Sequence, residues 1–167
     1  MIVALTGFMA CGKSTFGRAV AESLGRRFLD LDNLTSPGRS AGEALRSMGI
    51  EAFRECESAA LSEVLSTGGD CILALGGGTV ISEQNRSLLK ASAKVIWLRT
   101  SMEIILSEIS NSDRPLAQGL GREELESMFK EREPYYRAAC DATVEINEKD
   151  IDKVVDEIVG IIEKFDK

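Results

Sequence analysis

Histidine is absent from this chain of 167 residues. Its absence excludes catalysis by a histidine acid or base, and it excludes histidine as a metal ligand. Basic residues are also in the minority, since 20 lysines and arginines stand against 27 acidic residues and the net charge is −7. Proteins that bind nucleic acid usually carry a basic surface, so we expect no nucleic acid among the partners.

Long hydrophobic runs are lacking as well. The longest apolar runs hold about five or six residues, whereas a membrane span needs roughly 20. The first residues have neither the basic leader nor the cleavage site of a signal peptide, and the four cysteines form no Cys-x-x-Cys or zinc-binding pattern. We therefore expect a cytoplasmic protein with reduced thiols and no contact with membranes. Without heptads or a large exposed apolar stripe, we also expect a monomer.

Short apolar runs alternate with longer amphipathic segments. The pattern predicts strands at 2–5, 28–32, 71–75, 95–98 and 142–146, and helices at 15–24, 52–65 and 151–162. Apolar strands separated by helices are typical of a parallel sheet that is covered on both faces. The length suits one domain, so we predict a single α/β domain with a five-stranded, doubly wound parallel sheet. The segment 111–121, which contains proline and two glycines, is predicted to be a mobile loop.

The strongest motif follows the first predicted strand. Residues 7–14 fit the pattern G-x-x-x-x-G-K-[ST], with a strand before it and a helix after it. Gly7 and Gly12 let the backbone wrap closely around an anion, and backbone N–H groups then converge on a phosphate at the helix N-terminus. Lys13 would reach the β- and γ-phosphates, and the Ser14 hydroxyl would be a ligand of Mg²⁺. The motif predicts a nucleoside triphosphate without distinguishing a kinase from other NTPases.

Two carboxylates end the second predicted strand. Asp30 and Asp32 are two residues apart, so on a strand they would point to the same side, and ligands of open α/β sheets bind beyond the carboxyl ends of the strands. One carboxylate would then serve Mg²⁺ through water, while the other would accept a proton from an attacking hydroxyl or orient it. The alternative is structural, because Asp32 or Asn33 could cap a following helix.

Three consecutive glycines and several arginines complete the candidates. The triplet at 76–78 suits a place where a ligand approaches the main chain, although a flexible turn would explain it too. Arg54 can pair with Glu57 one helical turn later, Arg114 lies in the predicted loop, and Arg132 precedes a proline. Arginine binds carboxylates and phosphates through two N–H groups at once, but a solvated surface arginine is the alternative for each.

Taken together, these motifs resemble those of the shikimate kinases, a family of small P-loop enzymes similar to nucleoside monophosphate kinases. The resemblance extends over nearly the whole chain, and the motifs occur in the order of that family. They are the phosphate loop at 7–15, the aspartate segment at 28–32, Gly38-Arg39-Ser40 with 52–57, Leu75 with the glycine triplet, Arg114-Pro115-Leu116, and Arg132-x-Pro134-x-Tyr136. The resemblance implies a three-layer P-loop kinase fold with a substrate-binding segment at about 32–62 and a lid at about 110–122.

The family also implies an activity, namely transfer of the γ-phosphoryl group of ATP to the 3-hydroxyl of shikimate with Mg²⁺, in the synthesis of chorismate and aromatic amino acids. By position, Asp32 would hold the shikimate hydroxyls and act as base or orienting group. Arg54, buttressed by Glu57, would bind the shikimate carboxylate together with Arg132. Arg114 would close over ATP and stabilise the transferring phosphoryl group. Other implied contacts are, for the nucleotide, Ala10, Cys11, Gly12, Lys13, Ser14, Thr15 and Lys149; for the metal, Ser14 and Asp30; and for shikimate, Gly76, Gly77 and Gly78.

The chain departs from the family pattern in several places. Ala10 replaces a usual glycine, the segment 33–38 is about two residues short, and Ser107 stands where an arginine often packs on adenine. None of these changes removes a group that the chemistry needs. Two alternatives stay open, namely another P-loop small-molecule kinase, such as a gluconate kinase or a nucleoside monophosphate kinase, and a kinase-like binding protein without catalysis.

Overall fold

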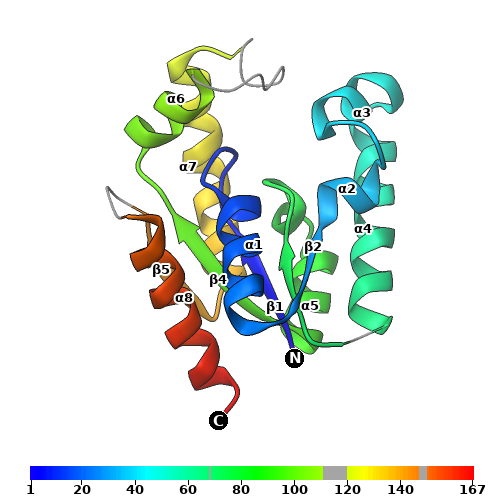
Figure 1. Cartoon of the computed structure of the whole chain (residues 1–167). Coiled ribbons are helices and arrows are strands. Elements are labelled where there is room, and N and C mark those ends of the chain that lie inside the picture. Colours follow the sequence, from blue (N-terminus) through cyan, green and yellow to red (C-terminus); the bar gives the residue numbers. More distant parts are fainter. Residues whose placement is uncertain (68, 111–119, 147–149) are drawn as a thin grey trace.

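The computed structural model describes residues 1–67, 69–110, 120–146 and 150–167 (Figure 1). Within these ranges, five strands form one parallel sheet in the order β2-β3-β1-β4-β5. The strands are β1 (Ile2–Thr6), β2 (Arg27–Asp30), β3 (Cys71–Ala74), β4 (Lys94–Arg99) and β5 (Ala142–Glu145). The predicted fold class, an α/β domain with a five-stranded parallel sheet, is therefore confirmed.

The connections between the strands are mainly helical. The helices are α1 (Lys13–Leu24), α2 (Leu31–Thr35), α3 (Ala41–Met48), α4 (Ile50–Thr67), α5 (Glu83–Ser92), α6 (Met102–Ser110), α7 (Arg122–Ala139) and α8 (Ile151–Phe165), with a short 3₁₀ turn, η1, at Thr79–Ile81. The three helices predicted from sequence lie within α1, α4 and α8. The prediction did not include α2, α3, α5, α6 or α7. Of these, α7 contains Pro134, a residue that lacks the N–H group a helix interior requires. The predicted mobile loop lies mostly outside the described residues.

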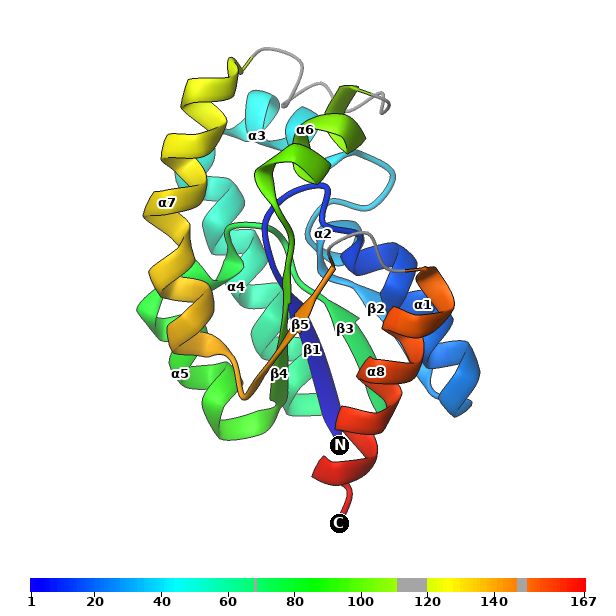
Figure 2. The same cartoon turned by 90° about the vertical axis from the view of Figure 1, so that its left-hand side faces the viewer.

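Two hydrophobic cores cover the two faces of the sheet. Val3 and Leu5 of β1 pack with residues of α1 and α8, whereas Ile2 and Ala4 pack with residues of α4, α5 and α7. Successive residues of a strand point to opposite faces, so one short apolar run contributes to both cores. Figure 2 shows the sheet between these two helical layers. In the described parts of the chain, no helix is both long and apolar enough to cross a membrane.

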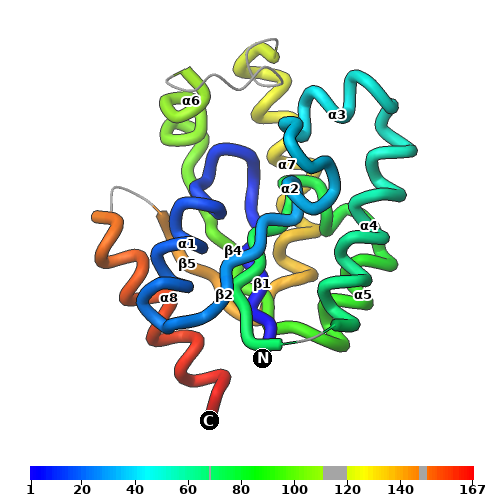
Figure 3. Tube along the Cα trace, turned by 45° about the vertical axis from the view of Figure 1, so that its right-hand side comes forward, coloured from blue at the N-terminus to red at the C-terminus, as the bar shows by residue number. Residues whose placement is uncertain are grey.

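The carboxyl ends of β1, β2 and β3 lie next to one another. Leu5 and Asp30 both pair with Ala74, so the loop after β1, the end of β2 and the loop after β3 meet at one edge of the sheet. Helices α2 and α3 extend beyond this edge (Figure 3). One detail of the prediction is wrong, because β2 ends at Asp30 and Asp32 belongs to α2. The strand argument for a shared side therefore does not apply to these two carboxylates.

Candidate active site

A cleft of about 460 Å³ opens at this edge of the sheet. Its walls come from the loop after β1, from α2, α3 and α4, from the loop after β3, and from α7. It brings together most of the side chains predicted from sequence, which are Lys13, Ser14, Asp30, Asp32, Arg54 and Arg132, with Glu57, Ala10, Gly12 and the glycine triplet 76–78 beside them. Residues from six separate segments thus converge on one cavity.

The phosphate loop joins β1 to α1. Gly12 adopts a left-handed conformation (φ 88°) and directly precedes α1, so the N-terminus of the helix faces the cleft with Lys13 and Ser14 in its first turn. The Lys13 ammonium donates hydrogen bonds to the carbonyl oxygens of Gly7 (3.0 Å) and Phe8 (2.8 Å). A cation and a helix N-terminus at the same place make this loop a site for an anion.

Ala10 is the one residue other than glycine with a positive φ (61°) in the described part of the chain. In this conformation the Cβ atom of an L-residue crowds the following carbonyl, which costs roughly 1–2 kcal/mol. A glycine at this position, which the resemblance implies is usual, would avoid that strain. Ala10 therefore keeps the loop conformation at an energetic cost.

Replacing Ala10 with glycine should raise the free energy of unfolding by about 0.5–1 kcal/mol, because the relief of strain exceeds the greater flexibility that glycine gives the unfolded chain. Urea unfolding would measure the change. Ala59, an exposed residue within α4, supplies the control, since Ala59→Gly should lower stability by up to about 1 kcal/mol. A loss of stability in Ala10→Gly would contradict the interpretation of strain.

Asp30 links the phosphate loop to α2. Its Oδ2 atom accepts a hydrogen bond from the Ser14 hydroxyl (2.6 Å), and its Oδ1 atom accepts one from the backbone N–H of Asp32 (3.1 Å). The carboxylate therefore caps α2, a role that the sequence analysis considered for Asp32 or Asn33 instead. The cap holds the start of α2, and with it Asp32, against the cleft. The segment 33–38, which is about two residues short, begins within this brief helix, and the helix ends at Thr35.

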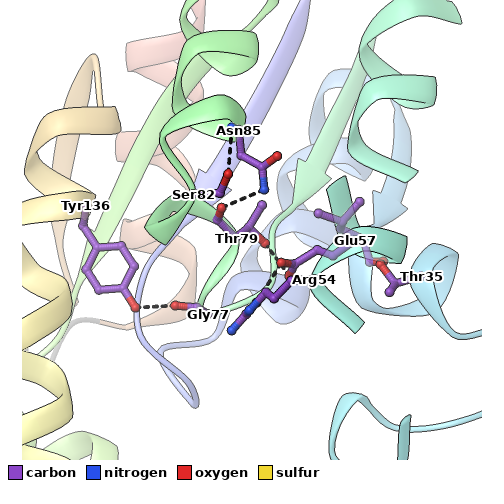
Figure 4. Close-up of polar contacts among 9 residues, drawn as sticks. Thr35, Arg54, Glu57, Gly77, Thr79, Ser82, Asn85 and Tyr136 are labelled. Carbon is purple, nitrogen blue, oxygen red and sulfur yellow. Dashed lines mark hydrogen bonds and ion pairs between the residues drawn. The ribbon is translucent and has the colours of Figure 1, made fainter. Parts of the chain in front are cut away.

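A buried polar network supports Arg54. Its Nη1 atom donates to Glu57 Oε2 (2.7 Å), and Glu57 Oε1 accepts from the Thr79 hydroxyl (2.8 Å). The backbone carbonyl of Thr79 in turn accepts from the Asn85 side chain (3.0 Å). Figure 4 shows Glu57 between Arg54 and Thr79. Because Glu57 is fully buried, its charge requires such partners, and the predicted pairing of Arg54 with Glu57 is confirmed.

The glycine triplet leaves room for these charged groups. A Cβ atom at position 76 would lie 2.5 Å from Glu57 Oε1 and 2.9 Å from Asp32 Oδ1. At Gly77 it would lie 3.4 Å from the backbone nitrogen of Met9, so this loop runs beside the phosphate loop. At Gly78 it would overlap the guanidinium of Arg54. Close approach of side chains, rather than unusual backbone angles, explains the first and third glycines.

Replacing Gly78 with alanine should displace the Arg54 guanidinium while leaving the fold intact. The backbone of Gly78 (φ −117°) suits alanine, and the overlapping atoms are the far end of a flexible side chain. We expect the free energy of unfolding to change by less than about 1 kcal/mol. Affinity for a ligand held by Arg54 should fall at least about tenfold, by loss of a charged hydrogen bond. Calorimetric titration with shikimate, the ligand that the resemblance implies, measures this affinity, and a separate titration measures the affinity for ATP.

Gly160 in α8 is the matched control for this substitution, because a Cβ atom there meets open space. Gly160→Ala should raise stability slightly and leave both affinities unchanged. Unaltered shikimate affinity in Gly78→Ala would mean that the position of Arg54 does not matter for binding.

Helix α7 contributes two residues one turn apart. The Arg132 guanidinium lies over the ring of Phe8 in the phosphate loop, 5.9 Å from the ring centre. The hydroxyl of Tyr136 donates to the backbone carbonyl of Gly77 (2.6 Å), as Figure 4 shows. Burial raises the pKa of Tyr136, although the charges of Arg132 and Arg54 oppose the rise, so the phenol stays protonated and remains a donor. The helix thus contacts both loops that border the cleft.

The remaining predicted residues have other places. Arg114 and Lys149 lie outside the described residues, and so does most of the predicted lid. Cys11 and Thr15 do not line the cleft. The Cys11 side chain is buried in the core on the α1 and α8 side of the sheet, and Thr15 is exposed on α1. Four further polar residues lie around the site. Thr79 and Asn85 belong to no motif found in the sequence, whereas Arg39 and Tyr136 were predicted only as members of motifs, without roles of their own. For Tyr136 a signal existed, since it follows Arg132 by four residues and so shares its helix face.

Comparison with known proteins decides the family. A family model described as shikimate kinase matches residues 9–163. The chain belongs to the shikimate kinase family. It is 34% identical to a shikimate kinase of Dictyoglomus turgidum over 163 residues, which covers 94% of both chains. It is 37% identical to one from Caldanaerobacter subterraneus subsp. tengcongensis, covering 94% of this chain and 93% of the relative.

Solved structures agree with the family assignment. A shikimate kinase from Acinetobacter baumannii in complex with shikimate superposes with a TM-score of 0.85 at 30% identity, covering 98% of this chain and 93% of that one. A gluconokinase from Sinorhizobium meliloti gives a TM-score of 0.65 at 18% identity, covering 98% of this chain and 91% of that chain, which shows a shared fold only. Membership in the shikimate kinase family confirms the predicted reaction class, ATP-dependent transfer of a phosphoryl group to shikimate.

Proposed function

We propose that the cleft binds shikimate between α2, α4 and α7, and that the phosphate loop presents the γ-phosphoryl group of ATP to the 3-hydroxyl of shikimate. The observation that carries this proposal is the convergence of Arg54, Arg132 and Asp32 beside the phosphate loop. Shikimate offers one carboxylate and three hydroxyls, so it matches both kinds of group. Phosphoryl transfer depends mainly on positioning and on stabilising charge, which is what such an arrangement supplies.

Arg54 and Arg132 would bind the carboxylate of the substrate from α4 and α7. Arg54 is already oriented by Glu57, whose second oxygen is held by Thr79, so little conformational entropy remains to be lost on binding. The carboxylate then fixes one end of the substrate, and its hydroxyls point toward Asp32. A substrate held at both ends presents a single hydroxyl for reaction.

Asp32 would accept hydrogen bonds from the substrate hydroxyls and act as base or orienting group for the one that reacts. Its place in the first turn of α2 is fixed by the cap that Asp30 makes. Lys13 would turn from the loop carbonyls to the β- and γ-phosphates, which carry a full negative charge and are therefore stronger acceptors. Arg114 would come from the lid and stabilise the transferring group, as the family resemblance implies.

The residues present fit a magnesium ion. The Ser14 hydroxyl and the Asp30 carboxylate lie 2.6 Å apart, and both are oxygen ligands of the hard type that Mg²⁺ prefers. Mg²⁺ is usually bound by one or two protein groups together with substrate phosphates and waters. We propose that Ser14 is a direct ligand and that Asp30 acts through water. The bound ion would neutralise charge on the phosphates during transfer.

Release of ADP from ATP tests the proposed function. The rate should rise only when shikimate and Mg²⁺ are both present, and gluconate, AMP or no acceptor should leave it at background. Chelation of Mg²⁺ with EDTA should abolish the shikimate-dependent rate, and added Mg²⁺ should restore it. Stimulation by gluconate or AMP instead would keep the phosphate loop but overturn the substrate. Binding of ATP without transfer to any acceptor would favour a binding protein.

We further propose that the chain is a cytoplasmic monomer. Light scattering tests the monomeric state.

A further inference from the structure

The hydroxyl of Tyr136 links helix α7 to the glycine loop, residues 76–78, through a backbone atom of the site. It donates to the carbonyl oxygen of Gly77 over 2.6 Å, and the side chain is fully buried. The ring stacks on Trp97 of β4, with 5.9 Å between ring centres and 29° between planes. The phenol is therefore held by the sheet, and it holds the loop in turn.

This hydrogen bond orients a peptide group that borders the cleft. The Gly77 carbonyl and the Gly78 N–H belong to the same planar peptide unit, which is trans and therefore directs the two groups in opposite directions. A carbonyl held toward α7 thus directs the Gly78 N–H away from α7. The Thr79 N–H closes this turn on the Gly76 carbonyl (3.2 Å) without engaging the Gly77–Gly78 peptide, and neither glycine has a side chain to restrict it, so the Tyr136 hydroxyl selects the orientation of this peptide.

The same helix face carries Arg132, one turn before Tyr136. Residues four apart on a helix are neighbours, so the contact of Tyr136 with Gly77 also sets how close Arg132 comes to the glycine loop. On the other side, the loop continues into Gly78, whose Cα borders the guanidinium of Arg54. The positive charges of both arginines lower the pKa of the Tyr136 phenol, against the larger effect of burial. Tyr136 therefore lies where the two arginines and the loop meet.

We propose that Tyr136 is a positioning residue for shikimate, whose hydroxyl fixes the Gly77–Gly78 peptide and seats Arg132 against it. The proposal rests on the proposed function, since it assumes that Arg54 and Arg132 bind the substrate carboxylate. Tyr136 itself does not line the cleft and acts through these groups.

Tyr136→Phe tests the proposal, with Tyr135→Phe as the matched control. Phenylalanine keeps the ring against Trp97 and removes only the donor, which leaves the half-buried Gly77 carbonyl without this partner. We expect KM for shikimate to rise about tenfold, KM for ATP to change less than about twofold, and the melting temperature to fall by only a few degrees. Tyr135 is the adjacent residue, half-buried beneath Arg86, and its substitution should alter neither KM.

A second pair of measurements separates positioning from general packing. In an Arg132→Ala background, Tyr136→Phe should raise KM for shikimate less than about threefold, because one of the groups it positions is gone. Incorporation of para-aminophenylalanine at position 136 restores an N–H donor and should recover much of the lost affinity for shikimate. This variant also tests the proposal if the phenylalanine variant does not fold. Fluorescence of Trp97, the single tryptophan, reports whether the helix still packs on β4.

Several results would overturn the proposal. A wild-type KM for shikimate in Tyr136→Phe would do so, as would a full tenfold loss that persists without Arg132. An equal rise in both KM values with a large fall in melting temperature would show a structural role only. If the wild-type protein binds ATP but not shikimate, the proposed function itself fails, and this result is distinguishable because it appears before any substitution is made.

Discussion

Substitution of Lys13 by alanine is expected to reduce kcat by at least about a thousandfold, because in the proposed function the ammonium is the main protein charge that binds the β- and γ-phosphates. The side chain stands in the first turn of α1, where it now donates to the carbonyls of Gly7 and Phe8. Alanine retains the helix but removes the charge. ADP release at saturating ATP, shikimate and Mg²⁺ would measure the loss.

Lys90→Ala is the matched control for this experiment. Lys90 is exposed in the last turn of α5 and does not line the cleft, so its removal should leave kcat unchanged. Far-ultraviolet circular dichroism should be the same for both variants and the wild type. A Lys13→Ala enzyme with a wild-type rate would show that the loop at 7–14 does not hold the reacting phosphates.

The second large effect concerns Arg132. Its replacement by alanine should weaken shikimate binding by roughly 2–5 kcal/mol, because the proposed function makes Arg132 a charged partner of the substrate carboxylate in a partly buried site. ATP affinity should stay nearly the same, since the phosphate loop keeps its own lysine and backbone donors. Calorimetric titration with shikimate and, separately, with ATP measures the two affinities.

Arg137, the residue after Tyr136 on the same helix, provides the comparison. Its guanidinium is largely exposed and pairs with Glu133, so Arg137→Ala should change neither affinity. If Arg132→Ala binds shikimate as tightly as the wild type does, the carboxylate must be bound elsewhere. If it loses ATP affinity as well, α7 would have a wider role than the one proposed.

Much of the architecture could be predicted because the apolar runs are short and regular. Each strand was found from a run such as residues 2–5, whose alternate side chains enter both cores. The phosphate loop was equally predictable, since its glycines, lysine and serine are adjacent in sequence. Arg54 with Glu57 followed from helical spacing alone, and the structure confirms that pair.

Other features depend on tertiary contacts that no local pattern contains. The end of β2 was placed two residues late, because Leu31 is as apolar as a strand residue but begins α2 under the cap of Asp30. The partners of Thr79 and Tyr136 lie 22 and 59 residues away along the chain, so spacing alone cannot pair them. Pro134 argued against a helix at this place in the sequence, although α7 contains it.

The product formed from ATP, Mg²⁺ and shikimate tests the central claim most directly. Two-dimensional ¹H–³¹P NMR of the reaction mixture identifies which oxygen of the acceptor carries the new phosphate. The arrangement of Arg54, Arg132 and Asp32 around the phosphate loop predicts a single product, with phosphorus coupled to the proton at carbon 3 of shikimate. Phosphate on another hydroxyl, or no phosphorylated shikimate while another acceptor is consumed, would contradict the account.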